Sequence, residues 1–229
     1  MPLTIALKGI MIEIEEDLKS LGIFLKWASL EGVEVYDSRS SKYVVKAVEE
    51  AVEEVRSALT LEGLKDHPVI RAYRDFYWRL GIDPTKTRPS SEALIRRALR
   101  SGSIPLINNV VDLGNVASIR TMVPIGIYDL DKAALPLKLR RARVGELFHP
   151  IGGAPEALSD RDVVLVDSRG VVMHVFPHRD SVQTMVTQET KRILIVACGV
   201  RGVSEEVVRE AVELASKLIA ESCRAQARH

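Results

Sequence analysis

Cysteine is scarce in this sequence, which contains only Cys198 and Cys223 among its 229 residues. Two cysteines without a recognisable spacing cannot form a zinc site alone, and such sparing use is typical of a reducing compartment. We therefore expect a cytoplasmic protein without a zinc site built from its cysteines. No stretch of about 18 apolar residues occurs, which argues against a membrane-spanning helix and a membrane partner. The amino-terminal stretch carries acids early and lacks a basic region, so we expect no secretory signal.

An excess of charge of either sign is lacking as well. Lys plus Arg number 32 and Asp plus Glu number 31, for a net charge of +1, while 46% of the residues are hydrophobic and 28% are charged. These values are typical of a globular protein and exclude intrinsic disorder and a strongly basic nucleic-acid coat, so we expect no DNA partner. A chain of this length can bury about 70% of its unfolded surface, so it does not need disulfide bonds or a bound metal to be stable.

Basic residues are nevertheless concentrated locally. The densest stretch supplies a candidate RNA-binding set, namely Lys86, Arg88, Arg96, Arg97 and Arg100. A second cluster consists of Lys138, Arg140, Arg141 and Arg143. A basic patch on a neutral protein can bind phosphates because the local field matters more than the net charge. The competing interpretation is a solvated helix face whose arginines are paired with neighbouring acids.

Short β-branched runs and helical periodicities divide the chain into a small α/β opening over 1–65, a core over 66–200 and a closing helix over 201–229. Strands are expected at 3–14 with a break at Gly9, and at 23–27, 33–36, 125–128, 137–139, 163–167, 171–176 and 193–198. Helices are expected over 43–59, after Pro68, after a Ser90 N-cap, over a short segment within 105–120, and from about 204. Helices and strands do not alternate regularly, which favours a single α+β domain.

Familiar catalytic motifs are missing. The sequence has no GxxxxGK[ST] phosphate loop, no GxGxxG after a strand and no GxSxG nucleophile elbow. His174 and His178 are four residues apart, but Pro177 lies between them in a segment with β character. Their rings therefore do not share a helix face, and we do not expect a zinc pair.

Polar residues instead gather in three apolar contexts. The first, IPLINNVVDLGNVASI, contains Asn108, Asn109, Asp112 and Asn115. If this segment is helical from about residue 108, then 108, 112 and 115 share one face. Because Asn and Asp are weak helix formers, they serve as caps, in a buried network or as ligands, of which the network is favoured.

The second context is FPHRDSVQTMVTQETKR, in which Arg179 and Asp180 end a β segment and threonines recur at Thr184, Thr187 and Thr190. Hydroxyls and an Arg–Asp pair at a strand end could line a pocket for a small polar ligand. A hairpin loop whose threonines merely favour β geometry is an equal alternative. The third context is Glu146, for which binding a backbone amide or neutralising Arg140 is favoured over a ligand role.

These residues resemble the B3/B4 module of the phenylalanyl-tRNA synthetase β subunit over roughly 70–200. The matching features are the run from Asn108 to Asp112, Asn115, the stretch from Pro124 to Asp129, Asp131, Arg140 with Ala142, Gly145 with Glu146, and Thr190 with the strand after it. The segment DPTKTRPSSEAL and the Arg-Asp-x3-Thr-x2-Thr-x2-Thr run also look like those of stand-alone proteins built on this module.

The resemblance implies a B3/B4-like α+β fold with a β-sandwich-like core and flanking helices. In the synthetase this module hydrolyses tyrosine mischarged on tRNA, without a cofactor. The resemblance therefore implies a protein that binds tRNA or aminoacyl-tRNA and could hydrolyse mischarged aminoacyl-tRNA in trans. The ligand-binding candidates are Asn108, Asn109, Asp112, Asn115, Asp129, Glu146, Arg179, Thr184, Thr187 and Thr190.

The bacterial editing residues are not retained. Where that pocket has a threonine, a histidine and a glutamate, this chain has Gly114, Gly126 and Val196. Any hydrolysis needs other groups, and Asp180 is the candidate general base. Arg179 beside it would lower the pKa of Asp180, and the pair would then suit a zwitterionic amino acid better than an ester.

Two other functions stay open from the sequence. The loss of the editing residues favours a pocket for an amino-acid-like small molecule, or an enzyme acting on one, without nucleic acid. The amphipathic segments 43–59 and 204–220 could offer a surface to a protein partner, although packing of one face on the core explains them more simply.

Overall fold

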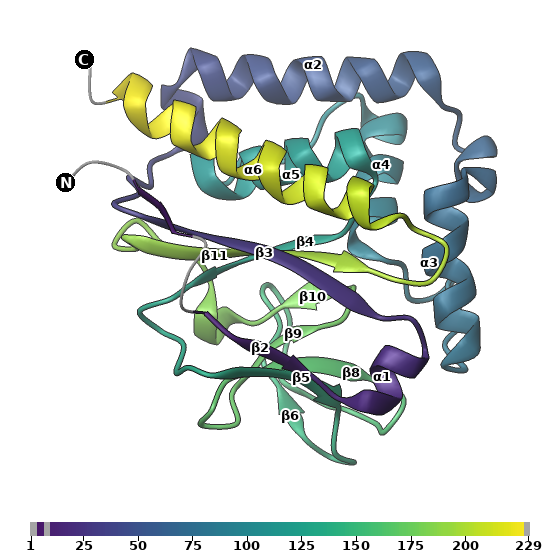
Figure 1. Cartoon of the computed structure of the whole chain (residues 1–229). Helices are drawn as coiled ribbons and strands as arrows, with labels where there is room; N and C mark the ends of the chain where they lie inside the picture. Colours follow the sequence, from purple (N-terminus) through teal and green to yellow (C-terminus); the bar gives the residue numbers. More distant parts are fainter. Residues whose placement is uncertain (1–3, 7–9, 227–229) are drawn as a thin grey trace.

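The computed structural model describes residues 4–6 and 10–226, which form a layer of helices over two stacked β-sheets, with a further two-stranded ribbon formed by residues 147–148 and 156–157 (Figure 1). The helices of the described part are α1 (Glu16–Ser20), α2 (Lys42–Ala58), α3 (Pro68–Arg79), α4 (Ser90–Ser101), α5 (Asn109–Thr121) and α6 (Glu205–Gln226). The strands are β1 (Thr4–Ala6), β2 (Ile12–Ile14), β3 (Phe24–Glu31), β4 (Ile125–Asp129), β5 (Leu137–Arg141), β6 (Leu147–Phe148), β7 (Glu156–Ala157), β8 (Val163–Val166), β9 (Val172–Val175), β10 (Arg179–Asp180) and β11 (Arg192–Gly199). The predicted α+β class and the single domain are confirmed.

The first sheet has four strands in the order β1-β3-β11-β4, and all its neighbours are antiparallel. Its central strand β11 carries the apolar run ILIVAC, which is buried throughout. Helices α5 and α6 pack together over this sheet, and α2 packs against α5 on the outer side (Figure 1). The buried face of α2 contains Val44, Val48, Ala51 and Val55, as the helical spacing predicts.

The second sheet has the order β10-β9-β8-β5-β2, with β2 parallel to β5 and the other pairs antiparallel. The rings of Tyr128 from β4 and His174 from β9 meet edge to face, with centroids 6.2 Å apart, and so join the two sheets. Because β3 belongs to the first sheet and β2 to the second, the opening segment of the chain is built into both layers.

Two local expectations are wrong. Residues 33–36 are not a strand, because an amide side chain of α5 takes the place of a neighbouring strand: Asn109 Oδ1 accepts from Tyr36 N at 2.9 Å, and Asn109 Nδ2 donates to the Glu34 carbonyl at 2.9 Å. Ser90 begins α4 without capping it, because Pro89 occupies the cap position and Ser90 N donates to the Pro177 carbonyl. Of the strand expected at 3–14, residues 3 and 7–9 lie outside the described residues.

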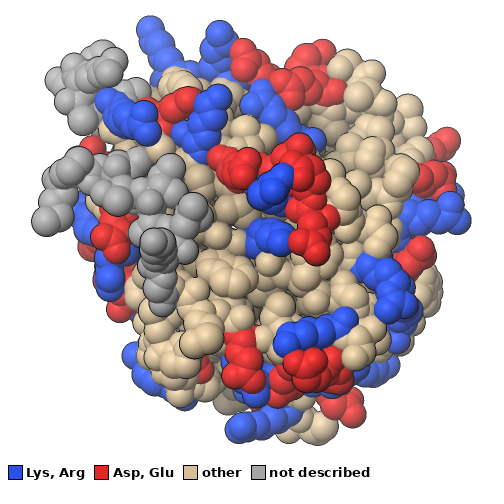
Figure 2. Space-filling model, viewed as in Figure 1, with Lys and Arg blue, Asp and Glu red and all other residues tan. Residues whose placement is uncertain are grey.

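Charges of both signs are interspersed on the face shown in Figure 2. The second basic cluster is largely neutralised, because Lys138 pairs with Glu15, Arg140 with Glu146 and Arg141 with Asp17. Among the helices of the described residues, none is long and apolar enough to cross a membrane.

Candidate functional site

A cavity of about 440 Å³ opens where α4 and α5 meet the β9–β10 hairpin. It is lined by Ser90, Ala93, Leu94, Arg97, Asn115, Ser118, Ile125, His174, His178, Arg179 and Asp180. Three separate parts of the chain contribute: α4, the α5–β4 unit and the hairpin. The sequence-predicted residues that it brings together are Asn115, Arg97, Arg179 and Asp180.

Asp180 is held by a histidine that sequence reasoning left without a role. The β9–β10 register places Asp180 opposite His174, so both side chains emerge on one face of the hairpin. His174 Nδ1 lies 2.8 Å from Asp180 Oδ1, and His174 Nε2 lies 3.8 Å from the Cys198 Sγ. Burial raises the pKa of the Cys198 thiol well above its usual range, so the thiol keeps its proton and donates to Nε2. The imidazole then donates from Nδ1 to the Asp180 carboxylate.

A glycine makes room for this arrangement. A Cβ added at Gly126 would overlap the Tyr128 hydroxyl and lie 3.1 Å from Asp180 Oδ1. The Tyr128 side chain is 1% exposed, and burial, followed by the nearby Asp180 carboxylate, raises its pKa well above its usual value. Tyr128 is therefore a neutral phenol beside the carboxylate. This explains why the position has a glycine here, although the bacterial editing site has a residue with a side chain at the same place.

The other two replaced editing positions are also filled by packing. A Cβ at Gly114 would overlap the Ile127 side chain, and Val196 is 2% exposed in the middle of β11. Neither residue lines the cavity.

His178 forms part of the cavity wall and is anchored through one ring nitrogen. His178 Nδ1 lies 2.8 Å from the Arg88 carbonyl oxygen. A carbonyl can only accept, so Nδ1 carries the proton and Nε2 is an acceptor. Burial lowers the pKa of His178 to about 4; the hydrogen bond to the Arg88 carbonyl opposes this shift, and the positive charge of Arg179 adds a smaller lowering. The ring is therefore neutral near pH 7.

Arg179 does not pair with Asp180, contrary to the expectation. Successive side chains of a strand point to opposite faces, so Arg179 leaves β10 on the other side. There it pairs with Glu156 of β7, and its guanidinium carbon lies 5.8 Å from the Phe148 ring centroid. The buried Arg179 Nε has no hydrogen-bond partner among the described residues. Arg179 and His178 also line a second, smaller hollow of about 360 Å³ between α3 and β7.

An arginine groove adjoins the cavity along α4. This hollow of about 560 Å³ is lined by Arg88, Ala93, Arg96, Arg97, Arg100, Ser101, Ser103, Ile104 and Pro105. Because Ala93 and Arg97 line both hollows, the groove and the cavity adjoin each other at this part of α4. Lys86, the fifth residue of the predicted set, is exposed on the preceding loop and does not line the groove.

A single buried carboxylate partly balances the arginines. Glu92 is 0% exposed and pairs with Arg74 at 2.8 Å, while Arg88 and Arg96 approach it at 3.9 and 4.0 Å. Arg97 and Arg100 have no carboxylate within ion-pair distance in the part of the chain that the structure describes. The groove therefore keeps a net positive charge.

Most of the asparagine-rich run is structural. Asn108 caps α5 by accepting from Val111 N at 2.9 Å, and Asn109 anchors the segment 34–36. Asp112 accepts from Ser38 Oγ at 2.5 Å and from Ile107 N at 2.8 Å, and burial raises its pKa. Of the four candidate residues in this run, only Asn115 lines the cavity.

The threonines and the remaining candidates lie outside the cavity wall. Thr190 donates to Asp129 Oδ2 at 2.6 Å and accepts from Thr187 N at 2.9 Å, which closes the turn before β11. Thr184 is fully buried. Glu146 binds Arg140 and accepts from Arg143 N at 2.9 Å, as the structural interpretation predicts.

Sequence reasoning missed His174, His178 and Tyr128 as neighbours of Asp180. The only signal was the closeness of both histidines to Asp180 along the chain, since a short hairpin brings such residues together. Within the described ranges, no three His, Cys, Asp or Glu residues are grouped so that they could hold a metal ion.

Comparisons with known proteins agree with the sequence resemblance. Residues 72–224 match the model of the B3/4 domain family. The phenylalanine–tRNA ligase beta subunit of Carboxydothermus hydrogenoformans is 32% identical over 129 residues, covering 56% of this chain and 16% of the relative. That of Neisseria meningitidis is 29% identical over 91 residues, covering 40% of this chain and 12% of the relative. The matched part is thus a minor fraction of these relatives.

The fold is also similar to a solved structure. An N-terminal fragment of the phenylalanyl-tRNA synthetase beta subunit from Pyrococcus horikoshii matches with a TM-score of 0.53 and 19% identity. The match covers 93% of this chain and 49% of the fragment, so the shared architecture extends beyond the region of sequence similarity.

Proposed function

Because the chain belongs to the B3/4 domain family, we propose that it binds the aminoacyl end of tRNA and hydrolyses the ester that joins amino acid and tRNA. The observation that carries this proposal is that the α4 groove and the Asp180 cavity lie side by side and share Ala93 and Arg97 in their linings. A nucleic-acid end that lies along the groove would deliver its terminal group into the cavity. The relatives' names, phenylalanine–tRNA ligase beta subunit, support tRNA as the partner.

The groove suits phosphates. Its guanidiniums can each make two parallel hydrogen bonds to a phosphate, and Arg97 and Arg100 have no competing carboxylate among the described residues. Neutralising phosphates releases counterions, so the affinity should fall steeply as the salt concentration rises.

The cavity suits an aminoacyl ester. Such an ester has a free ammonium group but no free carboxylate, and Asp180 is the one carboxylate in the described cavity lining. His174 holds Asp180 Oδ1, which leaves Oδ2 to accept from the ammonium. Because Arg179 is paired with Glu156, the Arg–Asp grip that would favour a free zwitterion does not form.

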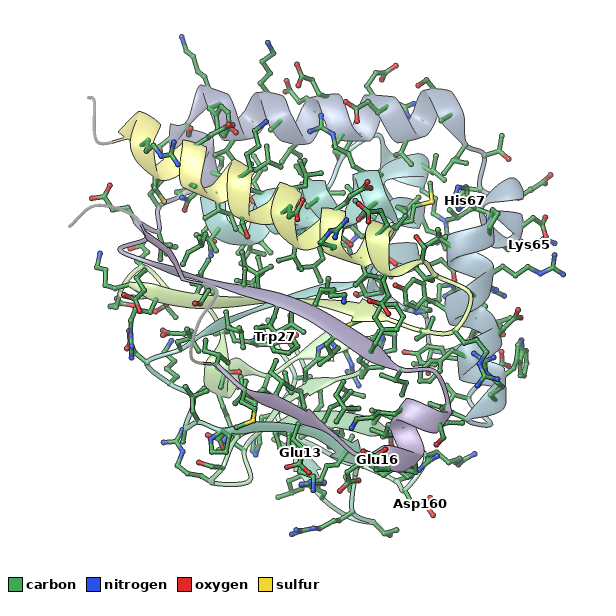
Figure 3. The ribbon with its side chains drawn as sticks, viewed as in Figure 1. Glu13, Glu16, Trp27, Lys65, His67 and Asp160 are labelled. Carbon is green, nitrogen blue, oxygen red and sulfur yellow. The ribbon has the colours of Figure 1, made fainter. Side chains whose placement is uncertain are left out.

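The groove is tested by retardation of unfractionated tRNA on native gels at several salt concentrations. We expect the double variant Arg97→Ala/Arg100→Ala to bind about tenfold more weakly, and the slope of log affinity against log salt to fall by about 2, since two phosphate contacts are lost. The matched control Lys65→Ala/Arg143→Ala removes the same charge from exposed positions outside the groove. Figure 3 shows Lys65 pointing outward beside α3.

Two outcomes would contradict the tRNA proposal. One is an equal loss of affinity in both double variants, which would reduce the interaction to net charge. The other is no retardation at low salt. If free amino acids then raised the melting temperature, a small-molecule pocket without nucleic acid would be the better assignment.

The cavity is tested with charged and uncharged tRNA. We expect wild type to bind the charged form more tightly, because only that form carries the ammonium. Asp180→Asn keeps the size of the side chain but removes its charge, and should erase the difference while leaving the affinity for uncharged tRNA unchanged. A preserved difference would remove Asp180 from the ammonium site.

A further inference from the structure

The role of His178 is not explained by its contacts. Its ring is largely buried in the wall between the main cavity and the smaller hollow. Through Nδ1 it is bound to the Arg88 carbonyl, which directly links it to the start of the arginine groove. Nε2 has no hydrogen-bond partner among the described residues, and it is not one of their buried unpartnered atoms. A structural histidine would normally use both nitrogens.

Burial keeps His178 unprotonated, and the charged groups around it modify this effect. Arg179 follows it in the chain and His174 precedes it on β9, and both oppose a positive charge on its ring, whereas the Arg88 hydrogen bond and the Asp162 carboxylate favour one. Arg97 also lines the cavity from α4. The proton at Nδ1 is committed to Arg88, so an approaching donor meets the lone pair of Nε2.

We propose that His178 Nε2 is the general base that activates the hydrolytic water in the cavity. This inference rests on the proposed function and names the base for its chemical step. Water gives a proton to Nε2 while its oxygen forms a bond to the ester carbonyl carbon. The tetrahedral intermediate then breaks the bond between that carbon and the ribose oxygen, which takes the proton from the imidazolium. The products are a free amino acid and tRNA with a free ribose hydroxyl, so atoms and charge balance.

Asp180 is less suited to this task. One of its oxygens already accepts from His174, and the other is assigned to the substrate ammonium. Asp180 therefore binds the ammonium group of the substrate, and His178 transfers the proton.

The test measures release of labelled amino acid from a panel of tRNAs, each charged with one radiolabelled amino acid. His178→Asn is the sharpest variant, because an asparagine amide nitrogen can replace Nδ1 at the Arg88 carbonyl while the Nε2 position is lost. We expect its first-order rate on bound substrate to fall about 100-fold or more, the usual size of a general-base contribution, with the tRNA affinity unchanged within about twofold. His149→Asn, on a loop outside the cavity, is the matched control and should keep the wild-type rate.

A second variant protects the test against misfolding. His178→Ala leaves a hole at the ring, and added imidazole should restore part of the rate if the lost function is proton transfer. A purely structural role would not respond to imidazole. The pH profile gives a third readout: between pH 8 and pH 5 the wild-type rate should change less than about twofold, whereas a histidine with its usual pKa would lose about 30-fold.

The outcomes separate this inference from the proposed function. An equal rate in wild type and His178→Asn, or a His178→Ala variant that imidazole does not rescue, overturns the general base and leaves the tRNA site standing. Retardation of tRNA with no release from any member of the panel overturns both hydrolysis and the base but not binding. No retardation overturns the whole site.

Discussion

Individual residues in the cavity are held by a chain of hydrogen bonds that runs from the core outwards. Cys198, which is 1% exposed, donates to His174, and His174 donates to Asp180. These hydrogen bonds hold the Asp180 carboxylate in place at the cavity wall. Polar groups in the interior need such partners, because an unpaired one costs about 1–3 kcal/mol.

At this scale we predict the effect of Gly126→Ala. The added Cβ would overlap the Tyr128 hydroxyl, and the buried ring has little room to move, so the free energy of unfolding should fall by about 1–3 kcal/mol. Urea denaturation measures this change. Gly63→Ala is the control, because its Cβ would meet only the Thr60 hydroxyl at 3.2 Å on the surface. Equal stability of the two variants would show that Tyr128 is not confined as described.

Among the secondary-structure elements, α4 and α5 begin in different ways although each has a good capping residue near its start. Asn108 has extended backbone and accepts a hydrogen bond from Val111 N. Ser90 already belongs to α4, and no side chain caps that helix; its backbone N–H is bound to Pro177 of the β9–β10 hairpin instead. The hairpin contact thus fixes α4 against the cavity.

This difference predicts unequal effects of two alanine substitutions. Asn108→Ala should lower the free energy of unfolding by about 1 kcal/mol, because the amide proton of Val111 loses its acceptor. Ser90→Ala should change it by less than about 0.5 kcal/mol, because no cap is lost. Thermal and urea unfolding of the two variants check this. A larger loss for Ser90→Ala would mean that its side chain caps α4 in solution.

The molecule as a whole buries a neutral histidine, and this makes its stability depend on pH. The folded pKa of His178 is about 4, below its usual value of 6.5, so below pH 6.5 the unfolded chain binds a proton that the folded chain does not. The stabilising contribution is fully present above pH 6.5 and is lost as the pH falls towards 4. His67, whose pKa burial also lowers, acts with the same sign. Asp112 acts oppositely, since its raised pKa favours the folded state at low pH.

We therefore predict that the His178 contribution to the free energy of unfolding falls by about 2 kcal/mol between pH 7.5 and pH 5. Urea denaturation at both pH values measures the change for wild type and for His178→Asn. The variant lacks the titrating ring, so its smaller pH dependence isolates the contribution of His178 from those of His67 and Asp112. Identical pH dependence in the two proteins would contradict a buried neutral His178.

The sequence by itself determined the periodic elements and the family. Val44, Val48, Ala51 and Val55 recur at helical spacing, and that spacing alone predicts the buried face of α2. The run ILIVAC predicted the strand at the centre of the first sheet. The match of Asn108 to Glu146 with the phenylalanyl-tRNA synthetase module predicted the B3/4 fold. Such features can be predicted from the sequence because they depend on neighbours a few residues away, or on motifs with fixed spacing.

Only the tertiary structure decided which polar groups meet. Arg179 and Asp180 are adjacent in the chain, yet the alternation of a strand sends them to opposite faces, and the β9–β10 register gives Asp180 to His174. The α4 arginines reach the same cavity because Ser90 is bound to Pro177, about 90 residues further along the chain. Register and long-range packing depend on the balance of many weak contacts, so no local pattern specifies them.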